Sequence, residues 1–246
     1  MEVFAASHVH SKWSYDGSWS LDELGAEFAR RGYRVLLMTE HDRGFTEERL
    51  NQYREACSKA SSSQILVMPG IEYSDAANRV HVLVWGPVPF LREGLPTGEM
   101  LDAVRAAKGL AVLAHPSRRD AWKSFEPSWA DNLLGIEVWN RKYDGWAPSQ
   151  TAPALVEIAG AIPFAGLDFH THRQFFSLAM ALDVHNEVSE ESVLDALRCR
   201  RCDARAFGLS LTQGMAHKAL PVLKIAERSR KMGASMVKRS RGRRTK

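Results

Sequence analysis

The segment Val3-Phe-Ala-Ala-Ser-His-Val-His10 is a short apolar run that ends in two histidines one residue apart. Such a run is typical of a buried β-strand, and side chains two positions apart in a strand point to the same face. We therefore expect His8 and His10 to project together from the end of a strand. In a β/α barrel, this is the end at which strands deliver side chains to the active site.

The same arrangement recurs along the chain, where a histidine or an acid follows an apolar run. The recurring residues are His41 after Val-Leu-Leu-Met-Thr-Glu, Glu72 after Ile-Leu-Val-Met-Pro-Gly-Ile, His115 after Leu-Ala-Val-Leu-Ala, and Asp168 and His170 after Ile-Pro-Phe-Ala-Gly-Leu. Asp16 lies in the loop beyond His10, and His81 opens its strand instead of closing it. Glu137 and Asn140 close a further strand, and we expect them to line the pocket without touching metal.

Short apolar runs alternate with amphipathic segments along the chain, which predicts βα units and a mainly parallel sheet. Strands are predicted at Val3–Ser7, Val35–Thr39, Ile65–Pro69, Val80–Trp85, Leu110–Ala114, Gly135–Trp139, Ala161–Ala165, Ser177–Asp183 and Arg205–Gly208. Helices are predicted at Leu21–Arg31, Thr46–Ala60, Gly98–Lys108, Gln150–Ala159, Ser189–Arg198 and Lys218–Met232. Seven or so strands with intervening helices indicate a closed or nearly closed barrel, and the alternative is an open doubly wound sheet.

The composition is that of a globular protein, with 246 residues of which 45% are hydrophobic and 25% charged. This length suits one large domain. No apolar stretch approaches the roughly 20 residues needed to cross a bilayer, and the N-terminus lacks the pattern of a signal peptide. Three cysteines cannot make a disulfide framework, and the Cys-x-x-Cys spacing of Cys199 and Cys202 is interpreted as a coincidence. A cytoplasmic location is therefore predicted.

The positive charge is concentrated at the C-terminus. Residues 222–246 hold ten Lys or Arg and one acid, a local net charge of +9. Because the whole chain has a net charge of +4, residues 1–221 have a net charge of −5. An acidic body suits a protein that collects cations. We predict a catalytic barrel over residues 1–215 and a basic helix and tail over 216–246, where the tail is either simply solvated or contacts nucleic acid.

The recurring histidines and acids form the ligand set of zinc, manganese and ferrous iron, in mixtures that suit catalysis. A single histidine at a strand end is usually a hydrogen-bonded structural residue. Five strand ends that carry such groups would destabilise a core unless something satisfied them all at once. A metal cluster does so, and Glu72, which is central among these strands, is the candidate for a carboxylate that bridges two cations about 3.5–4 Å apart.

Six motifs in sequence order resemble those of the PHP (polymerase and histidinol phosphatase) superfamily, from about Val3 to about Gly208. They are His8-Val-His10-Ser11, Ser14-Tyr-Asp16-Gly17, Thr39-Glu-His41-Asp42, Gly70-Ile-Glu72, Ala114-His115-Pro116 and Gly166-Leu-Asp168-Phe-His170. The resemblance implies a distorted (β/α)7 barrel that holds two or three divalent cations (Mn2+, Zn2+ or Fe2+). Glu40 stands where the family usually has Asp, and we expect it to orient a metal ligand.

Carried over motif by motif, the resemblance assigns three groups of metal ligands. The first group is His8, His10, Glu72 and Asp168; the second is Glu72, His81 and His115; the third is Asp16, His41 and His170. It also implies hydrolysis of phosphate esters on a small phosphorylated metabolite, a nucleotide or a short oligonucleotide, with a metal-bridging hydroxide as nucleophile. The catalytic candidates are Glu72, His115 and Asp168, and the substrate-binding candidates are Arg43, Arg118 and Arg119.

Two other functions stay open at this point. A bridging hydroxide also attacks carbonyl carbon, so an amidohydrolase-type C–N hydrolase would use the same ligands. A non-catalytic PHP module that aids nucleic-acid processing is the other alternative, although the loss of several ligands would mark that state and here the set looks complete. No membrane partner is expected, and the sequence indicates no particular oligomeric state.

Overall fold

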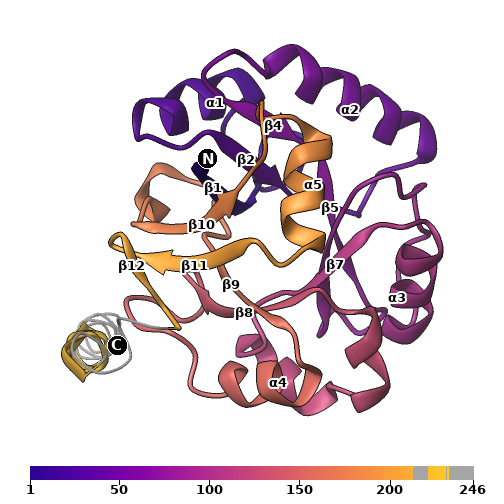
Figure 1. The fold of residues 1–246 in the computed structure, drawn as a ribbon. Coiled ribbons are helices and arrows are strands. Elements are labelled where there is room, and N and C mark those ends of the chain that lie inside the picture. Colours follow the sequence, from indigo (N-terminus) through magenta and orange to yellow (C-terminus); the bar gives the residue numbers. More distant parts are fainter. Residues whose placement is uncertain (213–220, 231, 233–246) are drawn as a thin grey trace, which may run out of the picture.

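The computed structural model describes residues 1–212, 221–230 and 232, and the strands of these residues pair into two six-stranded sheets (Figure 1). The strands are β1 (Glu2–Val9), β2 (Val35–Met38), β3 (Glu40–His41), β4 (Leu66–Met68), β5 (Gly70–Ser74), β6 (His81–Trp85), β7 (Leu110–Leu113), β8 (Gly135–Asn140), β9 (Ile162–Gly166), β10 (Leu178–Asp183), β11 (Cys202–Ala206) and β12 (Leu209–Ser210). The helices are α1 (Leu21–Arg30), α2 (Glu47–Ala60), α3 (Thr97–Ala106), α4 (Ala152–Ala159) and α5 (Glu190–Arg198). Short 3-10 helices span Arg118–Ser124, Pro127–Asn132 and His172–Gln174. The predicted α/β class is confirmed.

The strand pairing differs from the predicted closed barrel. One sheet has the order β12-β11-β10-β1-β2-β4 and the other β3-β5-β6-β7-β8-β9, with no continuous closed sheet among the described residues. The pairing is also less parallel than predicted, because β6 is antiparallel to both of its neighbours and β10 is antiparallel to β1 and β11. The prediction of a mainly parallel sheet is therefore wrong, and the predicted barrel is not confirmed.

At two places a single residue carries the chain from one sheet to the other. Thr39 separates β2 from β3, and Pro69 separates β4 from β5. Proline has no amide hydrogen and cannot continue a strand ladder, which explains the break at Pro69. Gly70 follows because a Cβ there would collide with the Met38 carbonyl and the Trp85 ring.

The two sheets meet again where β1 and β9 end. The Leu167 amide donates to the Ser7 carbonyl at 2.9 Å, and the Phe169 amide donates to the His8 carbonyl at 3.0 Å. The His10 amide in turn donates to the Phe169 carbonyl at 2.9 Å. The predicted ligands on β1 and after β9 are thus brought side by side at a junction between sheets.

The helices begin close to where the sequence predicts. Ser20 caps α1, accepting from the Glu23 amide at 3.2 Å, while the Glu23 carboxylate accepts from the Ser20 amide at 2.7 Å. This reciprocal pair is the predicted capping box. In Figure 1, α5 lies in front of the strands, and its Val193 and Leu197 are buried in the core.

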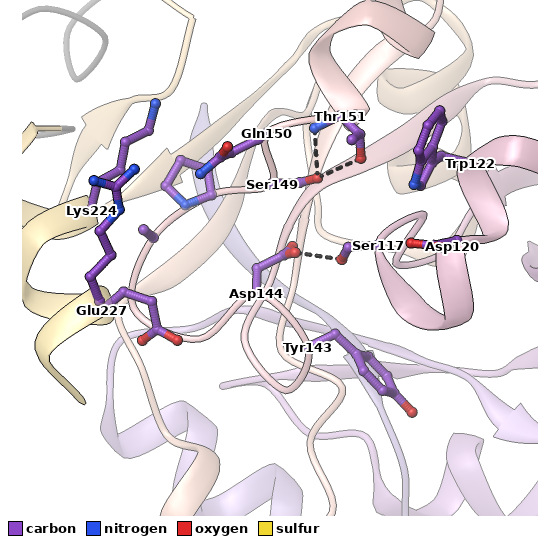
Figure 2. A pocket seen from close by; sticks show the side chains of 13 residues that line it. Ser117, Asp120, Trp122, Tyr143, Asp144, Ser149, Gln150, Thr151, Lys224 and Glu227 are labelled. Carbon is purple, nitrogen blue, oxygen red and sulfur yellow. Dashed lines mark hydrogen bonds between the residues drawn. The ribbon is translucent and has the colours of Figure 1, made fainter. Parts of the chain in front are cut away.

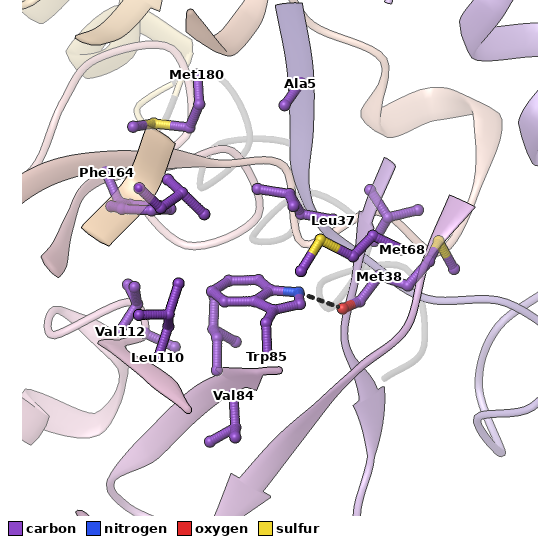
Figure 3. Packing of buried hydrophobic residues seen from close by; sticks show 14 of the residues in the cluster. Ala5, Leu37, Met38, Met68, Val84, Trp85, Leu110, Val112, Phe164 and Met180 are labelled. Carbon is purple, nitrogen blue, oxygen red and sulfur yellow. Dashed lines mark hydrogen bonds between the residues drawn. The ribbon is translucent and has the colours of Figure 1, made fainter. Parts of the chain in front are cut away.

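Trp85 occupies the centre of the apolar core at the end of β6 (Figure 3). Its ring stacks near Phe164, with ring centroids 6.2 Å apart, and only 1% of the residue is exposed. Its one polar atom, Nε1–H, donates to the Met38 carbonyl at 2.8 Å. The core therefore buries a large aromatic side chain without leaving its donor unpaired.

The predicted C-terminal helix is described in part. Residues 221–230 are helical, whereas the tail beyond Gly233 lies outside the described residues. None of the helices described combines the length and apolarity that crossing a membrane would require.

Candidate metal centre

The predicted ligands converge at the ends of the strands, around a pocket of about 180 Å3. His8 and His10 lie on and directly after β1, and both are completely buried. Residues from several strands and loops line the pocket: Tyr15, Asp16, His41, Asp42, Arg43, Glu72, Ser74, Asn78, His81, His115, Arg118, Lys142, Tyr143 and Asp168.

Glu72 lies at the centre of the cluster and is 1% exposed. Its Oε1 is 2.6 Å from His81 Nδ1 and 2.9 Å from His115 Nε2. Burial acts to raise the pKa of Glu72, but the charges of His81 and His8 outweigh it and hold that pKa well below its usual range. Glu72 is therefore a carboxylate in contact with several imidazoles, as a bridging ligand would be.

On the other side of Glu72, four donor atoms gather at similar separations. Glu72 Oε2 lies 3.4 Å from His8 Nε2 and 3.5 Å from His10 Nε2. Asp168 Oδ1 lies 3.9 Å from His8 Nε2 and 3.7 Å from His10 Nε2. Ligand atoms around a tetrahedral cation with bonds of about 2.1 Å lie about 3.4 Å apart. The spacing therefore fits one cation.

A third set of donors lies toward the pocket mouth. Asp16 Oδ1 is 3.3 Å from His41 Nε2, and Asp16 Oδ2 is 3.1 Å from His170 Nε2. Partial burial acts to raise the pKa of Asp16, but its close contacts with His170 and His41 lower it below its ordinary value. His10 joins this set, since its Nε2 and donor atoms of His41 and His170 lie within 4.8 Å of one another.

Several buried polar atoms of this cluster have no hydrogen-bond partner. They are His8 Nε2, His10 Nε2, His41 Nε2, Glu72 Oε2 and His115 Nδ1. A buried polar atom without a partner costs about 1–3 kcal/mol. All five belong to predicted ligands. Bound cations would satisfy the four that face the cluster, whereas His115 meets Glu72 through its other ring nitrogen, Nε2.

Glu137 holds two of the histidine-bearing strand ends in place. Its Oε1 accepts from His8 Nδ1 at 2.8 Å, and its Oε2 accepts from the His115 amide at 2.6 Å and from Asn140 Nδ2 at 2.9 Å. A proton on His8 Nδ1 leaves the Nε2 lone pair for a cation. Gly166 is required beside it, because a Cβ there would overlap Glu137 Oε1.

Glu40 orients His10 through a serine. The Ser14 hydroxyl donates to Glu40 Oε2 at 2.5 Å, and its oxygen is 3.3 Å from His10 Nδ1. With the hydroxyl proton directed to Glu40, Ser14 accepts from His10 Nδ1–H and leaves Nε2 free. Glu40 Oε1 also accepts from the Ser11 amide at 3.0 Å and its hydroxyl at 2.6 Å. The Glu40 side chain, which is longer than the Asp usual in the family, is thus fully hydrogen bonded.

Three of the candidate ligands have a left-handed backbone. The φ angles are 62° at His8, 25° at His115 and 48° at Asp168. Such conformations cost about 1–3 kcal/mol in residues other than glycine, and they cluster at functional sites. Buried Phe169, packed 5.3 Å from Phe28 between ring centroids, anchors the neighbouring Asp168 against the core.

The three predicted substrate-binding arginines are placed differently. Arg118 and Arg43 line the pocket. Arg118 is held by Asn78, donating to its carbonyl at 2.7 Å and its Oδ1 at 2.8 Å. Arg119 donates to the same carbonyl at 3.0 Å but is not among the residues that line the pocket.

Lys142 is a pocket residue that the sequence reasoning missed. Its Nζ lies 3.0 Å from Asp168 Oδ1 and 3.4 Å from His170 Nε2. The signal was its position two residues after Asn140, on the loop that leaves the end of β8. Asn78 was missed too, since it lies in a turn before β6 without any motif around it.

No protein-family model matches the chain, and no curated protein matches it by sequence. Solved structures do match. A two-domain protein from Bacteroides vulgatus that contains a predicted PHP-like metal-dependent phosphoesterase is 19% identical, with a TM-score of 0.64 over 84% of this chain. The chain spans 65% of that protein's length.

Two further structures extend the comparison. PsfC from Pseudomonas syringae is 15% identical, with a TM-score of 0.61 over 93% of this chain and 98% of its own. The lesion-specific endonuclease Q from Pyrococcus furiosus is 16% identical, with a TM-score of 0.57 over 81% of this chain and 56% of its own. The fold of the chain is therefore similar to that of PHP-like metal-dependent phosphoesterases, the superfamily that its motifs resemble.

Proposed function

We propose that this protein is a metal-dependent phosphoesterase. The observation that carries the proposal is a set of buried donor atoms without hydrogen-bond partners, His8 Nε2, His10 Nε2, His41 Nε2 and Glu72 Oε2, in a cluster whose histidines and acids form three close triads. A structural role for these histidines would have paired their ring nitrogens, because unpaired buried groups destabilise the fold. The likeness in fold to PHP-like metal-dependent phosphoesterases supports the same function.

The proposed ligands form three groups that share Glu72 or adjoin it. They are His8, His10, Glu72 and Asp168; Glu72, His81 and His115; and Asp16, His41 and His170. When bound, the divalent cations would supply Lewis-acid activation of the phosphoryl group and of the attacking water. Imidazole nitrogen with carboxylate oxygen suits Mn2+, Zn2+ or Fe2+.

The protein's own cations favour phosphate as the group that is attacked. Arg43, Arg118 and Lys142 line the pocket. Arg118 is preorganised by its bonds to Asn78, so that less side-chain entropy is lost when it binds an anion. Lys142 contacts Asp168 directly, which places its ammonium group beside the proposed cations. A neutral amide would gain little from this concentration of positive charge, so phosphoester hydrolysis is favoured over C–N hydrolysis.

A nucleotide or short oligonucleotide is a substrate class that fits these features alongside a small phosphorylated metabolite. Endonuclease Q, whose fold is similar, is a lesion-specific endonuclease. The basic tail that would add nucleic-acid contacts lies largely outside the described residues. We therefore include phosphodiesters with phosphomonoesters in the test.

The test compares metal-loaded protein with the variant His10→Ala. Protein reconstituted with Mn2+, Zn2+ or Fe2+ is assayed on phosphomonoesters, phosphodiesters and acyl anilides, and bound metal is measured by elemental analysis. We expect at least two cations per chain and phosphoester hydrolysis that both chelator and His10→Ala abolish. His185→Ala, which removes an exposed histidine, is the matched control. Hydrolysis of anilides alone, or activity unchanged in His10→Ala, would contradict the proposal.

A further inference from the structure

A second cavity adjoins the metal-site pocket and is about twice its size. Its volume is about 370 Å3, compared with about 180 Å3 for the metal-site pocket. Tyr143 lines both. Its ring lies 4.7 Å from that of His115, and its hydroxyl accepts from Arg118 Nε at 3.1 Å. A molecule longer than one phosphoryl group could therefore occupy both spaces on either side of Tyr143.

The helix over residues 221–230 forms one wall of this cavity (Figure 2). Glu227 is buried and accepts from the Trp146 amide at 3.1 Å, while Arg230 donates to both of its carboxylate oxygens at 2.6 and 2.7 Å. Gly145 must be a glycine here, since its φ is +79° and a Cβ would overlap the Glu227 carboxylate. The contact between the helix and the 143–151 loop is therefore specific.

The acids that line the cavity are all engaged by other protein groups. Asp120 accepts from Lys123 at 2.8 Å, Asp144 accepts from the Ser117 hydroxyl at 2.5 Å, and Glu227 is held as described above. Burial raises the pKa of Asp144 to about 6, so that this carboxyl carries less than a full negative charge in weak acid. The negative charge on the walls is thus largely compensated.

The basic side chains that line the cavity, unlike its acids, are not engaged by groups of opposite charge among the described residues. Lys224 and Arg228 lie one turn apart on the helix, are exposed, and have no acidic partner among the residues that the structure describes. Figure 2 shows Lys224 on one side of the cavity and Trp122 on the other. Helix α4 begins beside Thr151 at the same wall, with no acid in its first turn, and its N-terminal dipole adds positive potential. The cavity offers two free cations, an indole ring and several hydroxyl groups.

We propose that this cavity binds a second phosphate, with its adjoining ring, of an elongated phosphorylated substrate whose reacting phosphate lies at the metal centre. Lys224 and Arg228 bind the distal phosphate, and Trp122 contacts the ring. The statement that the ligand of this cavity is the substrate of the metal centre rests on the proposed function, whereas the binding of a phosphorylated ligand to the cavity does not. The C-terminal helix thereby determines specificity instead of serving only as an attachment for the tail.

The experiment compares two phosphorylated probes on the full chain. One is p-nitrophenyl phosphate, with a single phosphate, and the other is 5′-phosphorylated dithymidylate, with a second one. In the variant Lys224→Ala with Arg228→Ala, we expect KM for the dinucleotide to rise about tenfold, with kcat and the hydrolysis of p-nitrophenyl phosphate unchanged. Lys59→Ala with Arg105→Ala removes two cations from exposed positions on α2 and α3 and is the matched control.

A calorimetric titration of dithymidylate into His10→Ala protein, with and without the two cavity substitutions, separates this inference from the proposed function. An absence of hydrolysis by the wild-type protein would contradict the proposed function, and a tenfold weaker Kd in the cavity variant would still support the cavity as a binding site. A Kd within twofold of the parent would overturn the inference. An equal loss with both phosphate probes would overturn it as well, because it would indicate a structural role for the helix.

Discussion

The two ends of β6 show how differently one strand is used. Trp85 at one end is buried among apolar side chains, and its single donor is paired with the Met38 carbonyl. His81 at the other end is also buried, but it lies among polar groups: its Nδ1 is 2.6 Å from Glu72 Oε1 and its Nε2 is 2.6 Å from Asn78 Oδ1, while the other oxygen of Glu72 has no hydrogen-bond partner. The first end stabilises the fold without a ligand. The second end adjoins a buried oxygen that the chain does not pair, which is typical of a binding site.

The largest expected effect lies at the core end. Trp85→Ala removes a fully buried indole and leaves a cavity, so we expect the free energy of unfolding to fall by about 3–5 kcal/mol. Denaturant unfolding of metal-free protein measures it. Trp85→Phe, which keeps most of the volume but loses the bond to Met38, is expected to cost less than Trp85→Ala. Equal costs for the two variants would mean that packing does not dominate here.

At the end of β6 that carries His81, the free energy of unfolding should depend on bound cations. In the metal-free protein, the loss of one ligand should not lower it. Saturation with a divalent cation at a hundredfold excess over Kd should raise the free energy of unfolding by about 2.7 kcal/mol. In His10→Ala this gain should be lost, while the metal-free stability stays equal or rises, because an unpaired buried nitrogen has been removed. Thermal unfolding with and without metal measures both. A marked loss of stability in metal-free His10→Ala would break the comparison.

A smaller effect is expected at Gly166, which does not bind metal but lies beside the Glu137 carboxylate that contacts His8. Gly166→Ala places a methyl group on Glu137 Oε1 and should displace that carboxylate from His8. Loss of such an orienting partner typically weakens metal affinity 10–100-fold, which metal titration would detect. Gly98→Ala is the control, since a Cβ there meets nothing closer than 3.7 Å. Equal affinities in both variants would show that Glu137 does not orient the ligand.

The smallest effect concerns pH. Burial raises the pKa of Asp144 to about 6 from an ordinary value of 3.8, so that ionisation favours the unfolded chain. Stability from this group is therefore fully present below about pH 4 and is lost as the pH rises to about 6. Asp144→Asn should remove this slope. Chemical denaturation of both proteins at pH 4, 5 and 7 measures it, and parallel slopes would contradict the expectation.

Strand and helix positions followed from local patterns. Each of the predicted strands overlaps an observed one, and the Ser20 cap begins α1 as expected. Local signals failed where two sheets had to be joined. The prediction ends a strand at Pro69 and misses β5 just beyond it, because a proline and a glycine in sequence suggest a turn, whereas here they move the chain from one sheet to the other.

The sequence by itself determined which chemistry is available: histidines and acids placed at strand ends, in an order that resembles one superfamily. Only the tertiary structure decided which ring nitrogens are tied and which stay free, because that depends on partners such as Glu137 and Glu40, which are distant in the chain from the histidines they orient. It also decided that Lys142 enters the pocket and that Arg119 does not line it. Hydrophobic periodicity is local, whereas the satisfaction of buried polar atoms is a property of the whole folded chain.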